Sequence, residues 1–273
     1  METLELEDYG HSFDYVTKVV DGLESLLLND LDGDKGNQGL VKGILSFNGL
    51  KIETVEGTEG FVDWLKNAIA TIYKSIKNFL KSIYDALFGH SKKRKELEDK
   101  INKIKATGNI RFEFKAKPFN NDHLRGFEEH MARARKRAEE NLRQADKHFE
   151  DILNRMGDSI KAEWEFIKRE TSNNKSWADS AKERTKRAGV IIDLAETEWK
   201  EIDKEVEKIN TLLIGVSDDM PKAEQDAKRK ELDLYKKSLN ERGRVAAMAA
   251  DYANKVLNQV EKEAKEVEKE IND

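Results

Sequence analysis

The chain has 273 residues, with 49 Lys+Arg, 54 Asp+Glu and a formal net charge of −5. It has no cysteine, which excludes disulfides and thiolate metal sites, and only two prolines, which the interiors of long helices tolerate poorly. Charged and hydrophobic residues each make up 38% of the chain. This balance favours thin helical hairpins with little core over a compact globule. Because no run of about 20 uncharged apolar residues is present, we expect no conventional membrane span.

Charge is distributed unevenly along the chain. Residues 1–60 contain 13 Asp/Glu and 4 Lys/Arg, residues 61–119 contain 6 and 14, and residues 120–273 contain 35 and 31. Such asymmetry bears on the partners of a protein rather than on its fold. The expected segments are an acidic leader (1–60), an amphipathic cationic helix followed by a basic helix (61–106), an extended connector (107–120) and a coiled-coil body of long helices (121–273).

The leader combines short apolar stretches with turn-forming residues. Residues 13–28 repeat apolar side chains every three to four positions, which predicts a short amphipathic helix. Residues 29–39 are rich in Asp, Gly and Asn and predict a turn, and a second apolar stretch follows at 40–50. A calcium loop that starts at Asp32 needs Gly at its sixth position and Glu at its twelfth, which are Asn37 and Gly43 here. We therefore expect no calcium site.

The most informative segment is the expected helix over residues 61–88. Lysines, asparagines and an aspartate lie opposite a wide apolar stripe. Two readings stay open for this helix: a core helix covered by the long helices, or a helix that contacts a membrane or a partner protein, since its cationic face and its Trp and Tyr side chains suit a lipid interface. The candidate contact face consists of Phe61, Trp64, Leu65, Ile69, Ile72, Tyr73, Ile76, Phe79, Leu80, Ile83, Tyr84, Leu87 and Phe88.

Two features follow this helix. A basic patch formed by Lys92, Lys93, Arg94 and Lys95 suits either a helix C-terminus or the phosphates of DNA or lipid, and a solvated charge run is the alternative. Residues 108–119 alternate apolar and charged side chains between a Gly-Asn pair and Pro118, which predicts a short extended segment.

The rest of the chain predicts helices. Apolar residues recur at three-to-four spacing over 122–156, 177–213 and 222–272, with a shorter helix between Gly157 and Ser176. Narrow stripes of this kind indicate coiled-coil-like antiparallel packing. The predicted fold is all-α: an elongated antiparallel helical bundle of coiled-coil hairpins with a short extended segment near 108–119.

No catalytic or metal-binding constellation is apparent. His123 and His130 would share a helix face but lie about 10 Å apart along its axis, too far to hold one metal ion. Neither a phosphate-binding glycine loop nor a nucleophile-elbow pattern is present. We therefore expect no enzymatic activity, no catalytic or metal-ligating residues, no cofactor and no small-molecule substrate.

The order of these segments resembles that of internal head (inner-body) virion proteins of large tailed bacteriophages. The residues that carry the resemblance are the acidic leader with Gly22-Leu23-Glu24-Ser25-Leu26, the joint that ends at Gly60, the helix 61–88 and the basic run 92–95. The resemblance implies that a prohead protease removes the leader after a Glu, with Glu56, Gly57, Glu59 and Gly60 as the candidate cleavage residues. Val55 and Thr58 depart from the commonest forms of that cleavage pattern.

The resemblance also implies where the protein acts and with what. The protein would be made in the host cytoplasm, packaged inside the phage head and ejected with the DNA. Its partners would be other virion proteins or further copies of itself, together with an anionic lipid membrane and non-specific contacts to DNA. Removal of residues 1–59 would change the net charge from −5 to +4, so the leader would mask a cationic product.

Two other classes of function stay open. An α-helical pore-forming toxin would bind membranes as the full-length chain, whereas a virion protein would need cleavage or an assembly partner first. A helical scaffold or adaptor would keep the helix 61–88 as part of its core, and Trp64→Asp would then unfold the protein.

Overall fold

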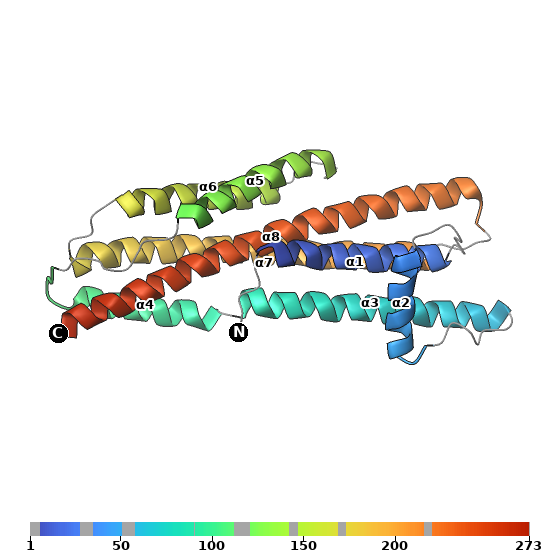
Figure 1. Cartoon of the computed structure of the whole chain (residues 1–273), viewed down its shortest axis with the longest axis horizontal. Helices are drawn as coiled ribbons and strands as arrows, with labels where there is room; N and C mark the ends of the chain where they lie inside the picture. Colours follow the sequence, from blue (N-terminus) through green and yellow to red (C-terminus); the bar gives the residue numbers. More distant parts are fainter. Residues whose placement is uncertain are drawn as a thin grey trace. The chain divides into compact units, whose positions relative to one another are not determined.

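The structure is a computed structural model that describes residues 6–27, 35–50, 58–89, 91–111, 121–141, 147–168, 173–215 and 220–272. Of these residues, 94% are helical and none belongs to a strand, which confirms the predicted all-α fold. The described helices are α1 (Leu6–Leu27), α2 (Lys35–Phe47), α3 (Thr58–Phe88), α4 (Ser91–Ala106), α5 (Asn121–Asn141), α6 (Lys147–Lys168), α7 (Asn174–Ile214) and α8 (Lys222–Asn272) (Figure 1).

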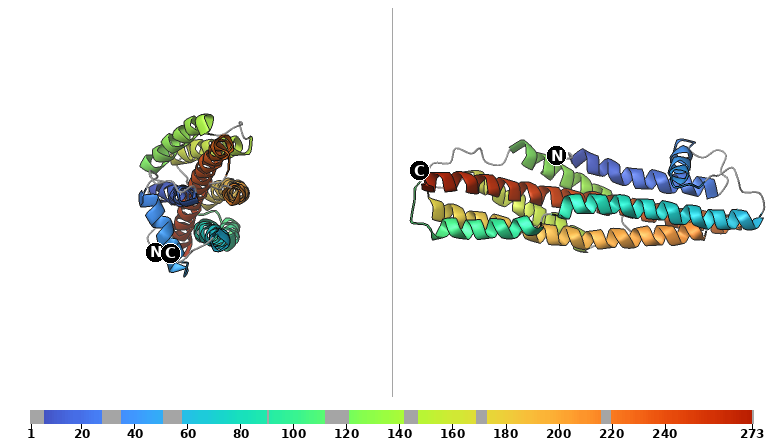
Figure 2. Two further views of the ribbon diagram at one scale, coloured as in Figure 1. Left: turned by 90° about the vertical axis from the view of Figure 1, so that its right-hand side faces the viewer. Right: turned by 90° about the horizontal axis from the view of Figure 1, so that it is seen from below.

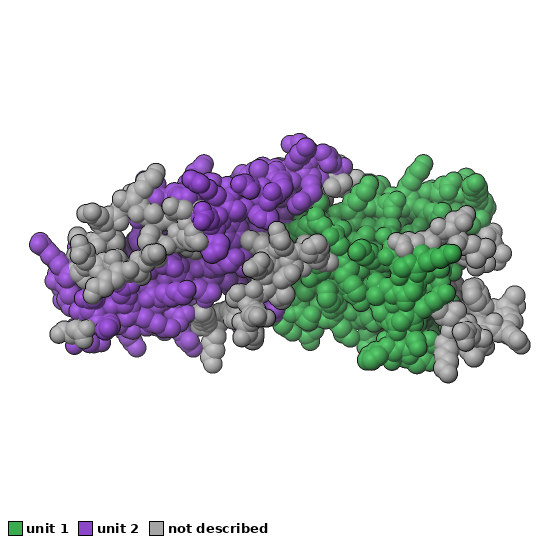
Figure 3. Space-filling model, viewed as in Figure 1, with its two compact units in different colours: residues 1–85, 200–244 green, residues 86–199, 245–273 purple. Residues whose placement is uncertain are grey.

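The chain divides into two compact units (Figure 3). Unit 1 comprises residues 1–85 and 200–244, and unit 2 comprises residues 86–199 and 245–273. The predicted acidic leader thus belongs to the same unit as most of the predicted amphipathic helix and as parts of α7 and α8.

In unit 1, α1 runs antiparallel to α8, because Asp14 contacts Arg244 whereas Glu24 contacts Arg229. Helix α2 stands across α1 in both Figure 1 and Figure 2. The crossing is close because Gly22 of α1 lacks a side chain: a Cβ there would lie 2.2 Å from the carbonyl oxygen of Asn37. Helix α2 then ends at Phe47 and is followed by Gly49, whose φ of 82° and neighbouring backbone hydrogen bonds form a Schellman cap.

The start of α2 differs from the sequence prediction. Residues 29–39 were expected to form a turn, but helix α2 begins at Lys35 and includes Gly36 and Gly39. The apolar side chains Val41 and Leu45 are buried on one face of α2. Burial of that face outweighs the low helix propensity of the glycines, because tertiary packing overrides a weak local preference.

In unit 2, α5 and α6 form a helical hairpin. The sequence predicted one helix over 122–156, but Arg135 of α5 donates hydrogen bonds to Glu150 (2.6 Å) and Asn154 (3.0 Å) of α6. The predicted break at Gly157 is also wrong, because α6 continues through it. The even apolar spacing on both helices hid the reversal, since two paired helices bury the same kind of stripe as one.

The described part of the predicted extended segment, residues 107–111, is tied to the start of α7. Asn174 donates hydrogen bonds from its side-chain amide to the carbonyl oxygens of Ile104 (3.0 Å) and Gly108 (2.9 Å), and its side-chain oxygen accepts one from the backbone N–H of Ile110 (3.0 Å). Asn174 thereby satisfies orphan groups at the end of α4. Arg111 and Asn173 form an isolated antiparallel bridge, and residues 112–119 lie outside the described residues.

A buried charged cluster lies at the centre of unit 2. The guanidinium of Arg184 (α7) donates to Glu163 of α6 (3.0 Å) and to Glu263 of α8 (2.6 Å), and Glu263 also accepts from Nε1 of Trp177 (3.1 Å). All four side chains are buried. Burial alone would lower the pKa of Arg184, but the two carboxylates raise it further above its ordinary value. The cluster therefore fixes how α6, α7 and α8 meet within this unit.

Candidate functional site

The apolar stripe of α3 is buried in the structure. Within unit 1, Ile69, Ile72, Ile76, Leu80 and Ile83 are buried, and in unit 2 so are Leu87 and Phe88. The aromatic side chains Trp64, Tyr73, Phe79 and Tyr84 are half-buried, whereas Lys66, Lys74 and Lys81 on the opposite face are exposed. The side chains of Phe61 and Leu65 lie outside the described residues. The two predicted faces are thus present, and the apolar one packs inside the protein.

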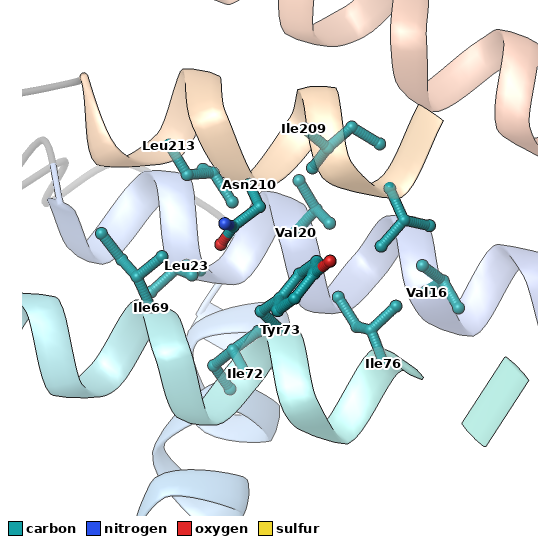
Figure 4. Close-up of a pocket in the computed structure, with 11 residues that line it drawn as sticks. Val16, Val20, Leu23, Ile69, Ile72, Tyr73, Ile76, Ile209, Asn210 and Leu213 are labelled. Atoms are coloured by element: carbon teal, nitrogen blue, oxygen red, sulfur yellow. The ribbon is translucent and has the colours of Figure 1, made fainter. Parts of the chain in front are cut away.

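Helices α1 and α7 cover this stripe in unit 1. Figure 4 shows Val16, Val20 and Leu23 of α1 and Ile209 and Leu213 of α7 pointing toward the α3 side chains. The gap among them is about 10 Å³, the space of roughly one water molecule. Its walls are almost wholly apolar, so it offers neither the volume nor the polar groups of a ligand site.

Aromatic contact extends this cover along α3. The rings of Tyr15 (α1) and Phe79 (α3) lie 5.0 Å apart between centroids. Phe13 of α1 is fully buried, and its ring lies on Gly243 of α8, where a Cβ would come within 2.2 Å of it. The leader helix is therefore seated in a groove whose other walls are α3, α7 and α8.

Ion pairs join the leader helix to α8. Asp14 pairs with Arg244 (2.7 Å), Glu24 pairs with Arg229 (3.4 Å), and both Asp21 and Glu24 pair with Lys236. Lys236 also pairs with Asp233 of its own helix. We call Asp14, Asp21 and Glu24 the leader acids, and Arg229, Lys236 and Arg244 the groove cations. Three acids of the leader thus face three cations of α8 along the length of α1.

Burial changes the pKa values of two members of these ion pairs, Lys236 and Glu24. The Lys236 side chain is only 8% exposed. Burial alone would lower the pKa of Lys236, but hydrogen bonds to Asp21 and Asp233 and the charge of Glu24 outweigh it and raise that pKa. Burial also raises the pKa of Glu24, and the charges of Lys236 and Arg229 only partly oppose this rise. Loss of either cation would therefore raise the pKa of Glu24 further.

Two of the four candidate cleavage residues fall at the start of α3. Glu56 and Gly57 lie outside the described residues. Glu59 and Gly60 were expected in the polar joint before the helix, but α3 begins at Thr58 and includes both of them. An acidic residue is favoured in the first turn of a helix, so the sequence is compatible with this earlier start. The side chain of Glu59 lies outside the described residues.

The basic patch is only partly available for other partners. Arg94 pairs with Glu98 (3.3 Å) of α4 and with Asp193 (3.8 Å) of α7 in unit 2. Its guanidinium also occupies the space above Gly189, where a Cβ would lie 2.1 Å from it. Lys95 is exposed, and the side chains of Lys92 and Lys93 lie outside the described residues. Arg94 thus contributes to the packing of unit 2.

The described residues hold no cluster of three or more His, Asp or Glu side chains that could bind a metal ion. His148 contacts the carbonyl oxygen of Leu194 at 3.1 Å. None of the described helices has the length and hydropathy that a membrane crossing requires.

Sequence reasoning missed the groove cations. They lie more than 200 residues from the leader acids along the chain, and each looks like one more charge on a charged helix, so no local signal marks them. No family model matches the chain, and its comparison with curated proteins and with solved structures gives no significant match.

Proposed function

We propose that the protein is a non-enzymatic virion protein that is packaged inside the head of a large tailed bacteriophage and contacts a membrane through α3 after maturation. In the stored form the leader helix α1 covers the apolar stripe of α3. Proteolytic cleavage between the leader and α3 then removes the covalent tie between them.

One observation carries this proposal: the helix that covers α3 precedes it in the chain, on the far side of the candidate cleavage joint. Val16, Val20 and Leu23 of α1 lie against Ile69, Ile72 and Ile76 of α3. The residues Val55-Glu56-Gly57-Thr58-Glu59-Gly60 stand between these two sets. A cut in this joint would therefore separate the cover from the covered helix, which is the arrangement that proteolytic activation requires.

The test is the intact mass of the protein recovered from its natural source. A mass short of the first 56 or 59 residues supports processing at the joint. We expect the cut after Glu56, because the bond between Glu59 and Gly60 lies in the first turn of α3, and helical backbone is a poor substrate for proteases. Glu56→Gln should then block processing, with Glu59→Gln as the matched control. An uncut 31.4 kDa chain in the virion would refute the maturation step.

A helical scaffold is the second candidate, and the burial of the α3 stripe favours it. In a scaffold the cover is permanent, so α3 never meets lipid. Flotation of the cleaved protein with liposomes separates the two functions: a scaffold stays in the aqueous fraction, whereas the proposed virion protein floats with the vesicles. A pore-forming toxin would float without any cleavage.

A further inference from the structure

The groove that holds the leader helix has two kinds of wall. One wall is the apolar stripe of α3 with Ile209 and Leu213 of α7. The other carries the groove cations of α8, which bind the leader acids. Helix α1 matches both walls, because its apolar side chains face α3 and its acids face α8.

Departure of α1 would change both walls at once. The α3 stripe would lose its cover, and the groove cations would lose Asp14, Asp21 and Glu24. Lys236 would keep Asp233 of its own helix. The result is an apolar strip beside a row of cations, and this combination suits the interface of an anionic bilayer, where acyl chains take up apolar side chains and headgroups pair with Lys and Arg.

We propose that α1 is an exchangeable occupant of this groove and that an anionic phospholipid surface replaces it, with Arg229, Lys236 and Arg244 binding the headgroups. This inference rests on the proposed function and adds to it the lipid class and the residues that select it. The leader is then an internal substitute for the membrane: acidic where headgroups would lie and apolar where acyl chains would lie.

The inference explains why the leader is held by charge as well as by apolar contact. Apolar contact with α3 alone would cover the stripe. The additional ion pairs make the occupied groove sensitive to a competing anionic surface, because such a surface offers the same cations many negative charges. A neutral bilayer offers none, so it should displace the leader poorly.

The experiment uses the full chain with a site-specific protease sequence in place of residues 51–57, so that one cut leaves both pieces present. The cut protein is mixed with vesicles of phosphatidylcholine alone, or of phosphatidylcholine and phosphatidylglycerol in equal amounts, and sedimented. We expect the body to sediment with the anionic vesicles while the leader stays in solution. Binding to the neutral vesicles should be much weaker.

Two sets of substitutions break the same ion pairs from opposite sides. Neutralising the leader acids (Asp14→Asn, Asp21→Asn, Glu24→Gln) loosens α1 and keeps the cations, so binding to anionic vesicles should rise. Neutralising the groove cations (Arg229→Gln, Lys236→Gln, Arg244→Gln) also loosens α1 but should lower binding, by roughly fivefold for each cation lost. The control is Lys222→Gln, Lys230→Gln, Lys237→Gln, which removes the same charge from exposed positions of α8 and should cost much less.

The outcomes separate the inference from the proposed function. If both sets raise binding equally, or if neutral vesicles bind as well as anionic ones, the inference is wrong and membrane contact by α3 survives. Leader and body sedimenting together in equal amounts would refute the exchange. If no vesicle binds, both membrane contact and the inference fail. Should either triple variant not fold, the single changes Asp14→Asn and Arg244→Gln give the same comparison at one partly exposed pair.

Discussion

The packing of the leader helix α1 against α8 can be tested at Gly243 in α8. A methyl group there would lie 2.2–2.4 Å from three ring atoms of Phe13, which is fully buried. Overpacking of this kind costs about 1–3 kcal/mol. Alanine in place of glycine inside a helix, however, stabilises the helix by about 0.8–1 kcal/mol. Gly243→Ala should therefore cost about 0–2 kcal/mol, whereas a helix without a docked Phe13 should gain about 1 kcal/mol.

A double-mutant cycle measured by urea unfolding isolates the contact between Phe13 and Gly243. Phe13→Ala removes the ring and by itself costs about 3–5 kcal/mol. In that background Gly243→Ala should become stabilising, so the coupling between the two changes should be about 1–3 kcal/mol. Gly126→Ala in α5 is the control for propensity alone, because no atom beyond the local backbone of its own helix lies within 4 Å of its Cβ position. If Gly243→Ala raises the free energy of unfolding equally with and without the Phe13 ring, the packing of α1 on α8 is refuted.

Three further predictions concern other buried polar groups. Arg184→Ala leaves Glu163 and Glu263 buried without their cation and should cost about 3–5 kcal/mol in urea unfolding; a loss under 1 kcal/mol would show that the cluster is hydrated. Tyr252→Phe removes the hydrogen bond to Ser159 (2.9 Å) and should cost about 0.5–1.5 kcal/mol, whereas no change would mean that this bond makes no net contribution. Burial raises the pKa of Glu205 above its ordinary 4.5, so the contribution of Glu205 to the free energy of unfolding should fall as pH rises through the raised pKa. Glu205→Gln should therefore raise the melting temperature at about pH 7. An equal gain at about pH 4 would contradict the reasoning.

Helical periodicity was sufficient for the fold class, because it depends only on which residues must leave water. It was insufficient wherever a chain reversal left the period intact. Arg135 meets Glu150 across the α5–α6 hairpin, yet the apolar spacing continues from one helix into the next. It also misplaced helix ends, as at Lys35 and Thr58, since packing and end charges shift boundaries by a few residues.

The candidate site was half visible in the sequence. The α3 stripe and the candidate cleavage joint are local features that a pattern can reveal. The partner of each leader acid depends on how α1 and α8 meet, and no local pattern reports a contact between residues more than 200 positions apart. The buried Asn174 was hidden for the same reason, because its four hydrogen-bonding partners lie in a separate segment, residues 104–110.

The width of the α3 stripe is explained by its packing. The sequence left open whether this wide apolar face is core or meets a membrane or a partner protein; in the structure α3 meets both α1 and α7, and two neighbours at different angles require a wide face. Width is therefore explained by packing and no longer distinguishes a core helix from a membrane helix. The remaining distinction is charge: Lys66, Lys74 and Lys81 are exposed on the far face of α3, and the groove cations of α8 are held by the leader acids. Any membrane affinity of the cleaved protein should therefore depend on anionic lipid far more than on apolar area, and flotation with liposomes, not the width of the stripe, separates a core helix from a membrane helix.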